Sequence, residues 1–133
     1  MMTKEQHDHI LIVCGLLVMW GISPEILGKI FQYLETRTGF SWNKEDASCH
    51  TAQKSAQFEC EALPSQSLGA FGFIITKCHP EIRIRIDDDD RFHVTPRFHY
   101  THPGGGTNGH QFPFDLIGDV KTGTFFEQAV GRL

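Results

Sequence analysis

The segment 82–100, IRIRIDDDDRFHVTPRFHY, decides the fold, because apolar and polar residues alternate on both sides of an acidic run. Isoleucines alternate with arginines before Asp87, and after Asp90 a second alternation continues to Tyr100. A period of two residues is typical of a strand with one buried face, and a polar run between two such strands is typical of a turn. The segment therefore predicts an antiparallel hairpin with its turn at residues 87–90.

The register of this hairpin follows from placing all its apolar residues on one face. Ile86 then pairs with Phe92, and Ile84 pairs with Val94. The opposite face collects the polar residues Arg83, Arg85, His93, Thr95, Arg97, His99 and Thr101. Pro96 lacks an N–H donor, so we expect the second strand to lie at a sheet edge or to be bulged there.

Two helices are predicted before the hairpin. Thr3 and Gln6 form a capping-box pattern, and residues 10–20 are apolar on every side, which places the first helix in the middle of the molecule. Residues 23–25, Ser-Pro-Glu, begin a second helix with one apolar face, and Gly39 ends it.

The rest of the chain carries weaker patterns. Residues 41–57 remain unassigned, residues 58–62 and 71–77 predict two strands, and residues 112–121 predict a final strand after a glycine-rich loop at 102–110. Thr124 and Glu127 form another capping-box pattern, which predicts a short C-terminal helix. The fold class is α+β: two N-terminal helices packed on an antiparallel β-sheet, a meander of about four to five strands, with that C-terminal helix, in a single domain over residues 1–133.

Composition limits the classes of function. The formal net charge of −4 argues against a protein that coats nucleic acid or anionic membrane through bulk electrostatics. The longest apolar run, residues 10–22, is shorter than the roughly 20 residues of a membrane-spanning helix, so no membrane partner is predicted. The four cysteines form no CxxC pair, which indicates free thiols and a cytoplasmic location.

The polar face of the hairpin is the strongest functional candidate, because guanidinium groups bind phosphate in a bidentate manner. We expect a non-enzymatic binding module, without a cofactor, that recognises a protein, an RNA or another phosphate-bearing ligand. The binding residues are expected on the hairpin face and in the glycine-rich loop: Arg83, Arg85, Thr95, Arg97, Thr101, His102, Gly105, Asn108 and His110. An edge strand would leave dimerisation open.

Two enzymatic alternatives remain from the same residues. In the first, His93 and His99 share the roles of general base and general acid in a metal-independent ribonuclease, and Arg85 and Arg97 stabilise the charged phosphate. Small ribonuclease toxins also combine helices with an antiparallel sheet, which is an analogy of architecture and not a family match. In the second, Asp119 and Lys121 form an acid-x-Lys site of a Mg²⁺-dependent nuclease.

Neither a calcium site nor a zinc site is predicted. The aspartates at 87–90 lack the interleaved spacing of a calcium loop, so a solvated turn is expected there. The histidines and cysteines lack the spacing of a zinc site, since His99 and His102 would point to opposite faces of a strand.

Overall fold

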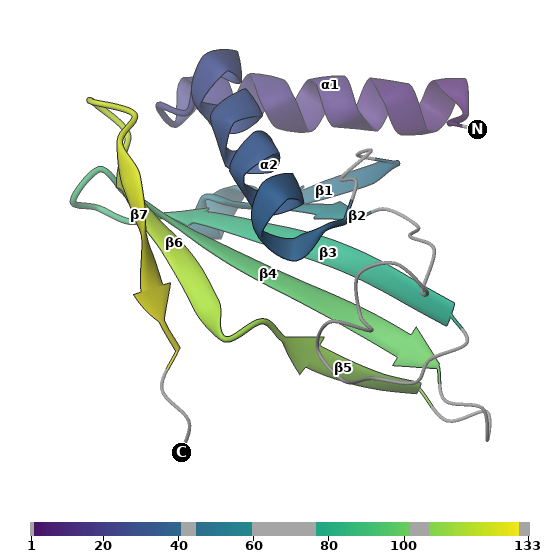
Figure 1. Ribbon diagram of the computed structural model, residues 1–133. Coiled ribbons are helices and arrows are strands. Elements are labelled where there is room, and N and C mark those ends of the chain that lie inside the picture. The colour runs from purple at the N-terminus through teal and green to yellow at the C-terminus, as the bar shows by residue number, and fades with distance from the viewer. Residues whose placement is uncertain (1, 41–44, 60–76, 102–106, 131–133) are drawn as a thin grey trace.

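The protein has two layers, a pair of helices and an antiparallel sheet (Figure 1). The computed structural model describes residues 2–40, 45–59, 77–101 and 107–130, with only the backbone at 77, 78, 100, 101, 107, 108 and 110. Helices α1 (Lys4–Met19) and α2 (Pro24–Thr38) lie on the same face of the sheet. The predicted α+β class with two N-terminal helices is confirmed.

The sheet has more strands than the predicted four to five. Its strands are β1 (Asp46–His50), β2 (Ser55–Glu59), β3 (Lys77–Ile86), β4 (Arg91–Thr101), β5 (Thr107–Gln111), β6 (Phe114–Asp119) and β7 (Phe125–Ala129), with a 3-10 turn at Thr51–Gln53. Six of them follow the order β1-β2-β3-β4-β6-β7, and β5 pairs with β4. The extra strands include β1, which lies in the stretch 41–57 that had no predicted element. β2 overlaps the predicted strand at 58–62 at residues 58 and 59, and residues 60–62 lie outside the described residues. The predicted strand at 71–77 lies outside the described residues except for its end.

The β3–β4 hairpin has the predicted register. Ile86 faces Phe92 and Ile84 faces Val94, without a bulge along the ten paired positions. The prediction of an edge strand or bulge at Pro96 is wrong, because β4 is an interior strand. Pairing with β6 ends at Val94 and pairing with β5 begins at Arg97, so Pro96 stands at the change of neighbour, where its missing N–H removes no ladder bond.

The two helices begin as predicted. Thr3 and Gln6 make both bonds of the capping box, and the Ser23 hydroxyl accepts a bond from the Ile26 amide. Gly39 ends α2 in the left-handed conformation, with φ of 79°.

The expectation that α1 lies in the middle of the molecule is wrong. Only its side with Ile10, Val13 and Leu17 is buried, while residues on the other side are exposed. The reason is that the described part of the chain forms a single helical layer, so nothing covers the outer side of α1. No single described helix is long and apolar enough to cross a membrane; α1 and α2 pass that test only as a pair, with a 112° bend between them.

The predicted C-terminal helix is wrong as well, because residues 125–129 form β7. Phe125 packs edge-on against Tyr33 of α2, and Glu127 accepts a hydrogen bond from the Tyr33 hydroxyl and pairs with Arg37 at 3.2 Å. A helix this short has a costly nucleus, whereas β7 adds a full ladder to β6. Tertiary pairing therefore overrides the local capping signal.

Candidate anion-binding pocket on the open face of the sheet

The sheet face turned away from the helices, called the open face below, carries polar side chains in rows that cross the strands. Buried residues alternate with these positions in β2, β3 and β4, as the sequence pattern requires. Three adjacent rows run from β1 to β4: His50-Ser55-Arg85-His93, Ser48-Gln57-Arg83-Thr95 and Asp46-Glu59-Glu81-Arg97.

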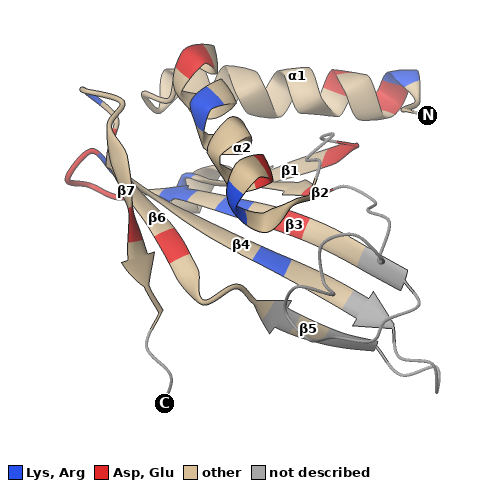
Figure 2. Ribbon diagram, viewed as in Figure 1, with Lys and Arg blue, Asp and Glu red and all other residues tan. Residues whose placement is uncertain are grey.

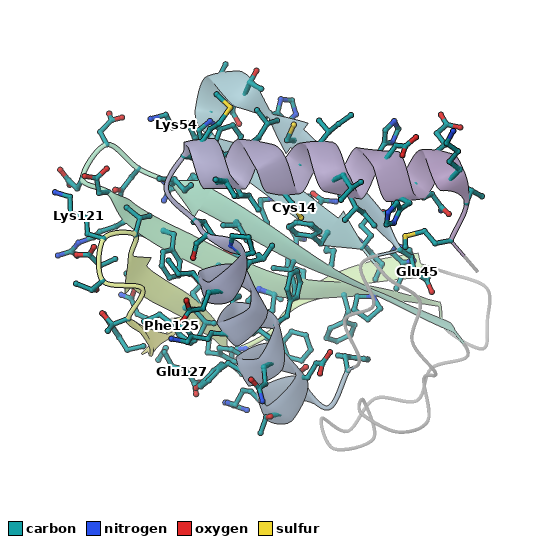
Figure 3. The ribbon with its side chains drawn as sticks, turned by 90° about the horizontal axis from the view of Figure 1, so that it is seen from above. Cys14, Glu45, Lys54, Lys121, Phe125 and Glu127 are labelled. Atoms are coloured by element: carbon teal, nitrogen blue, oxygen red, sulfur yellow. The ribbon has the colours of Figure 1, made fainter. Side chains whose placement is uncertain are left out.

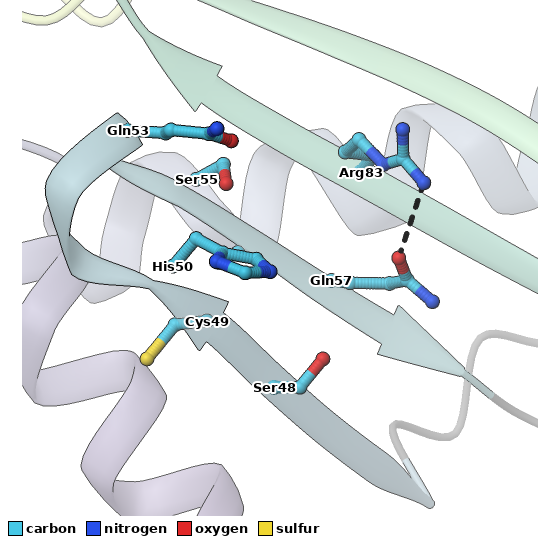
Figure 4. Close-up of a pocket in the computed structure, with 8 residues that line it drawn as sticks. Ser48, Cys49, His50, Gln53, Ser55, Gln57 and Arg83 are labelled. Atoms are coloured by element: carbon cyan, nitrogen blue, oxygen red, sulfur yellow. Dashed lines mark hydrogen bonds between the residues drawn. The ribbon is translucent and has the colours of Figure 1, made fainter.

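A pocket of about 270 Å³ opens over the parts of the first two rows that lie on β1, β2 and β3 (Figure 4). Its polar lining comes from β1, the following 3-10 turn, β2 and β3: Ser48, His50, Gln53, Ser55, Gln57 and Arg83. Cys49 and Ala56 complete the wall. The pocket therefore joins three strands through side chains from different parts of the chain.

The pocket lining carries positive charge without an acid. It contains the guanidinium group of Arg83 and the imidazole of His50, together with hydroxyl and amide groups, but no carboxylate among the described residues. Arg83 donates from Nη2 to the Gln57 side-chain oxygen at 3.5 Å (Figure 4), and no described acid pairs with it. An exposed guanidinium next to neutral donors is suited to bind an anionic group.

Arg85 lies on the same face two residues further along β3. Its side chain is exposed, and it makes no hydrogen bond or ion pair within the described residues. Thr95 stands opposite Arg83 on β4. The predicted residues Arg83, Arg85 and Thr95 are therefore neighbours at the border of the pocket.

Arg97 differs from these arginines because an acid holds it. Glu81 is only 5% exposed, and its Oε1 lies 3.8 Å from Arg97 Nε. Its Oε2 lies 3.4 Å from His99 Nε2 and accepts a bond from the Gln57 amide at 3.1 Å. This part of the face is neutralised by its own carboxylate, so the predicted phosphate contact of Arg97 has a competitor within the protein.

The structure does not bring His93 and His99 together. They are six positions apart along one strand, which corresponds to about 20 Å and is too far for both to touch one phosphate. His93 Nε2 lies 3.0 Å from Asp87 Oδ2, whereas His99 is near Glu81. The two imidazoles therefore belong to separate acid–histidine pairs, and they do not form the acid–base pair that the ribonuclease hypothesis requires.

The remaining predicted residues fall on β4, on β5 or outside the described part. Thr101 ends β4, while Asn108 and His110 are in β5, so the predicted loop is wrong from residue 107 onward. His102 and Gly105 lie outside the described residues.

The acid-x-Lys site has a structural role in this fold. Asp119 Oδ1 accepts bonds from the amides of Lys121 and Thr122, and it thereby closes the turn between β6 and β7. The ammonium group of Lys121 lies 3.5 Å from Asp90. Within the described ranges, no group of three metal-ligating side chains is present.

The acidic turn between β3 and β4 projects at one end of the sheet (Figure 2). Asp87 Oδ1 accepts bonds from the amides of Asp89 and Arg91, and its Oδ2 lies close to His93. The bond with His93, followed by these amide bonds, lowers the pKa of Asp87 below its ordinary value. Asp87 thus organises the turn as an ionised side chain.

The lowered pKa of Asp87 predicts a pH-dependent contribution to stability. The unfolded chain takes up the proton first, so this contribution is complete above the unfolded pKa of about 4 and is lost as the pH falls through the lower folded pKa. Asp87→Asn should lower the free energy of unfolding at pH 7 and flatten its dependence on pH below about 4. Urea unfolding at pH 7 and at pH 3 measures both. Asp88→Asn, in the same turn, is the control; equal effects of the two substitutions would contradict the assignment.

Most pocket residues were missed by the sequence reasoning. Ser48, His50 and Ser55 lie in a stretch where small residues such as Ala47 and Ala56 occupy the buried positions, so the alternation is weak. Glu81 was also missed, although it shares the odd-numbered face of Arg83 and continues the same alternation by one step.

The open face joins a pocket whose described lining contains no carboxylate to a neighbouring patch in which acids neutralise the basic side chains. Comparison of the chain with protein-family models, curated proteins and solved structures finds no match.

Proposed function

We propose that this domain is a binding module that holds a phosphate-bearing ligand in the pocket between β1, β2 and β3. The observation that carries the proposal is Arg83, a guanidinium group at the wall of a concave site that has no described carboxylate in its lining. The hydroxyls of Ser48 and Ser55 supply neutral donors for phosphate oxygens, and His50 supplies a ring N–H. Arg85 adds a second positive charge at the border.

The division of the open face supports the same conclusion. An anion placed over Arg97 would compete with Glu81, which already lies beside that guanidinium group. An anion placed over Arg83 displaces only a long contact with the Gln57 side chain. The favourable position for phosphate is therefore the pocket, at the end of the face nearer β1.

Titration with inorganic phosphate tests the proposal, with chloride at equal ionic strength as the reference. Binding should shift the backbone amide resonances of β1, β2 and β3 around the pocket. Arg83→Ala should weaken binding by about 10-fold to about 100-fold, because a hydrogen bond to a charged group contributes about 1.5–3 kcal/mol.

Arg91→Ala is the matched control. Like Arg83, Arg91 is an exposed arginine, but it begins β4, lies beside Asp119 of β6 and does not line the pocket. The substitution Arg91→Ala changes the net charge by the same amount as Arg83→Ala, and it should change the phosphate affinity by less than about twofold. If both substitutions weaken binding equally, the effect is bulk charge and the pocket is not the site.

A further inference from the structure

The outer side of α1 is an apolar surface that the rest of the described protein leaves uncovered (Figure 3). Its four large residues are 51–79% exposed: Leu11, Ile12, Val18 and Met19. Gly15 lies in the middle of them and is exposed as well. These five residues, called the outer stripe below, lie opposite the side of α1 that packs on the core.

The outer stripe is symmetric about Gly15. Leu11 and Ile12 precede it by four and three residues, and Val18 and Met19 follow it by three and four. All four positions share the helix side of Gly15 because residues three and four apart are neighbours on a helix. When two identical helices cross antiparallel at Gly15, each apolar residue on one side meets an apolar residue on the other: Ile12 meets Val18, and Leu11 meets Met19.

Gly15 also leaves room at the crossing point. A Cβ atom added there would have nothing within 4 Å, so the surface between the flanking side chains is open. A residue without a side chain allows two helix backbones to approach closely, with the four larger residues packed around the contact. A twofold axis through Gly15 gives the self-complementary contact that a symmetric dimer requires.

We propose that the outer stripe is the contact surface for a second copy of this chain, with two α1 helices crossing antiparallel at Gly15. Full burial of the four large side chains would remove about 500 Å² per copy from water, or about 1,000 Å² in total, which is at the lower limit for specific interfaces. The area therefore predicts a weak dimer that depends on concentration. A dimer through the stripe leaves the open face accessible, because that face lies on the other side of the sheet (Figure 1).

Charged residues limit the stripe to the second half of α1. Lys4 and Asp8 continue its line toward the N-terminus and are exposed. The overlap of the two helices is therefore restricted to residues 11–19 of each copy. An anionic lipid surface would also meet the carboxylates of Glu5 and Asp8 beside the stripe, which favours a protein helix as the occupant.

Sedimentation equilibrium of the whole chain between about 1 µM and about 1 mM tests the proposal over the range expected of a weak dimer. The wild-type protein should change from monomer to dimer within that range. Gly15→Lys should abolish the dimer, since it places two lysines together on the twofold axis, while helix propensity keeps α1 folded. A wild-type protein that stays monomeric, or that binds phosphatidylcholine vesicles through the stripe, overturns the proposal.

Gly28→Lys is the matched control, because Gly28 is an exposed helical glycine of α2 that also has nothing within 4 Å. This variant should dimerise as the wild type does. Gly15→Glu alone should be monomeric, but an equimolar mixture of Gly15→Glu and Gly15→Lys proteins should recover the dimer. If the mixture stays monomeric, the twofold axis does not pass through Gly15, and the proposal is contradicted.

The antiparallel direction has its own test. Ile12→Lys and Val18→Glu should each weaken the dimer, and the double variant should restore it because each lysine then meets the glutamate of the second copy. In a parallel pair, like charges would face each other, so a double variant weaker than either single variant overturns the antiparallel arrangement.

Discussion

Gly118→Ala is expected to lower the free energy of unfolding by about 3 kcal/mol, because it overfills a packed core. A Cβ atom at this position would lie 2.1 Å from Cζ of Phe92, the residue opposite it on β4. The Phe92 ring is completely buried and packs against Phe125, so it cannot turn into solvent. Urea unfolding followed by far-UV circular dichroism measures the loss.

Two further variants separate this clash from a general effect of losing glycine. Gly28→Ala, in the exposed interior of α2, has nothing within 4 Å and should stabilise the protein by about 0.5–1 kcal/mol. Phe92→Leu combined with Gly118→Ala should cost less than the sum of the two single changes, since the smaller side chain vacates the space. If Gly118→Ala lowers the free energy of unfolding no more than Gly28→Ala does, the close packing of the Phe92 ring against Gly118 is contradicted.

The hairpin was predictable because its signal is both long and regular. Isoleucines and aromatic residues occupy every buried position of β3 and β4 between Ile82 and Phe98 apart from Val94 and Pro96, so the period of two is unambiguous. In β1 and β2 the buried positions include Ala47 and Ala56, which carry too little apolar surface to mark a strand. The sequence therefore located the centre of the sheet but not its β1 edge.

The C-terminus shows why a local signal can fail. Thr124 and Glu127 have the spacing of a capping box, but Glu127 serves Tyr33 and Arg37 of α2 instead. These contacts join residues about ninety positions apart, which no window of local sequence contains.

Only part of the candidate site could be predicted, and the reason is related. Strand alternation alone placed Arg83 and Arg85 on a common face with Thr95. The pocket beside them also needs His50 and Ser55, which β1 and β2 bring from an earlier part of the chain. Alternation also indicates only the face on which a side chain lies. His93 and His99 share a face, but they are too far apart along β4 to act on one group.

Glu81→Gln is expected to destabilise the protein by about 2 kcal/mol, although it keeps nearly the same shape. Removing one partner of a fully buried ion pair costs about 3–5 kcal/mol, and the lower figure here reflects the access of water to Arg97 and His99, whose side chains are 34% and 42% exposed. Arg97 Nε has no hydrogen-bond partner among the described residues, so its charge depends on the nearby carboxylate. Chemical unfolding at pH 7 gives the difference.

Glu59→Gln provides the comparison, because Glu59 is the cross-strand neighbour of Glu81 and pairs with His79 at 3.4 Å. Its side chain is 32% exposed, compared with 6% for Glu81, so an ion pair in this position contributes less than about 1 kcal/mol. If burial decides the effect, the Glu81 variant loses clearly more stability than the Glu59 variant, and combining Glu81→Gln with Arg97→Gln recovers part of the loss. Equal effects at the two glutamates would show that Glu81 does not hold Arg97. Arg97 would then be as available to an anion as Arg83, and the pocket would no longer be the preferred site for phosphate.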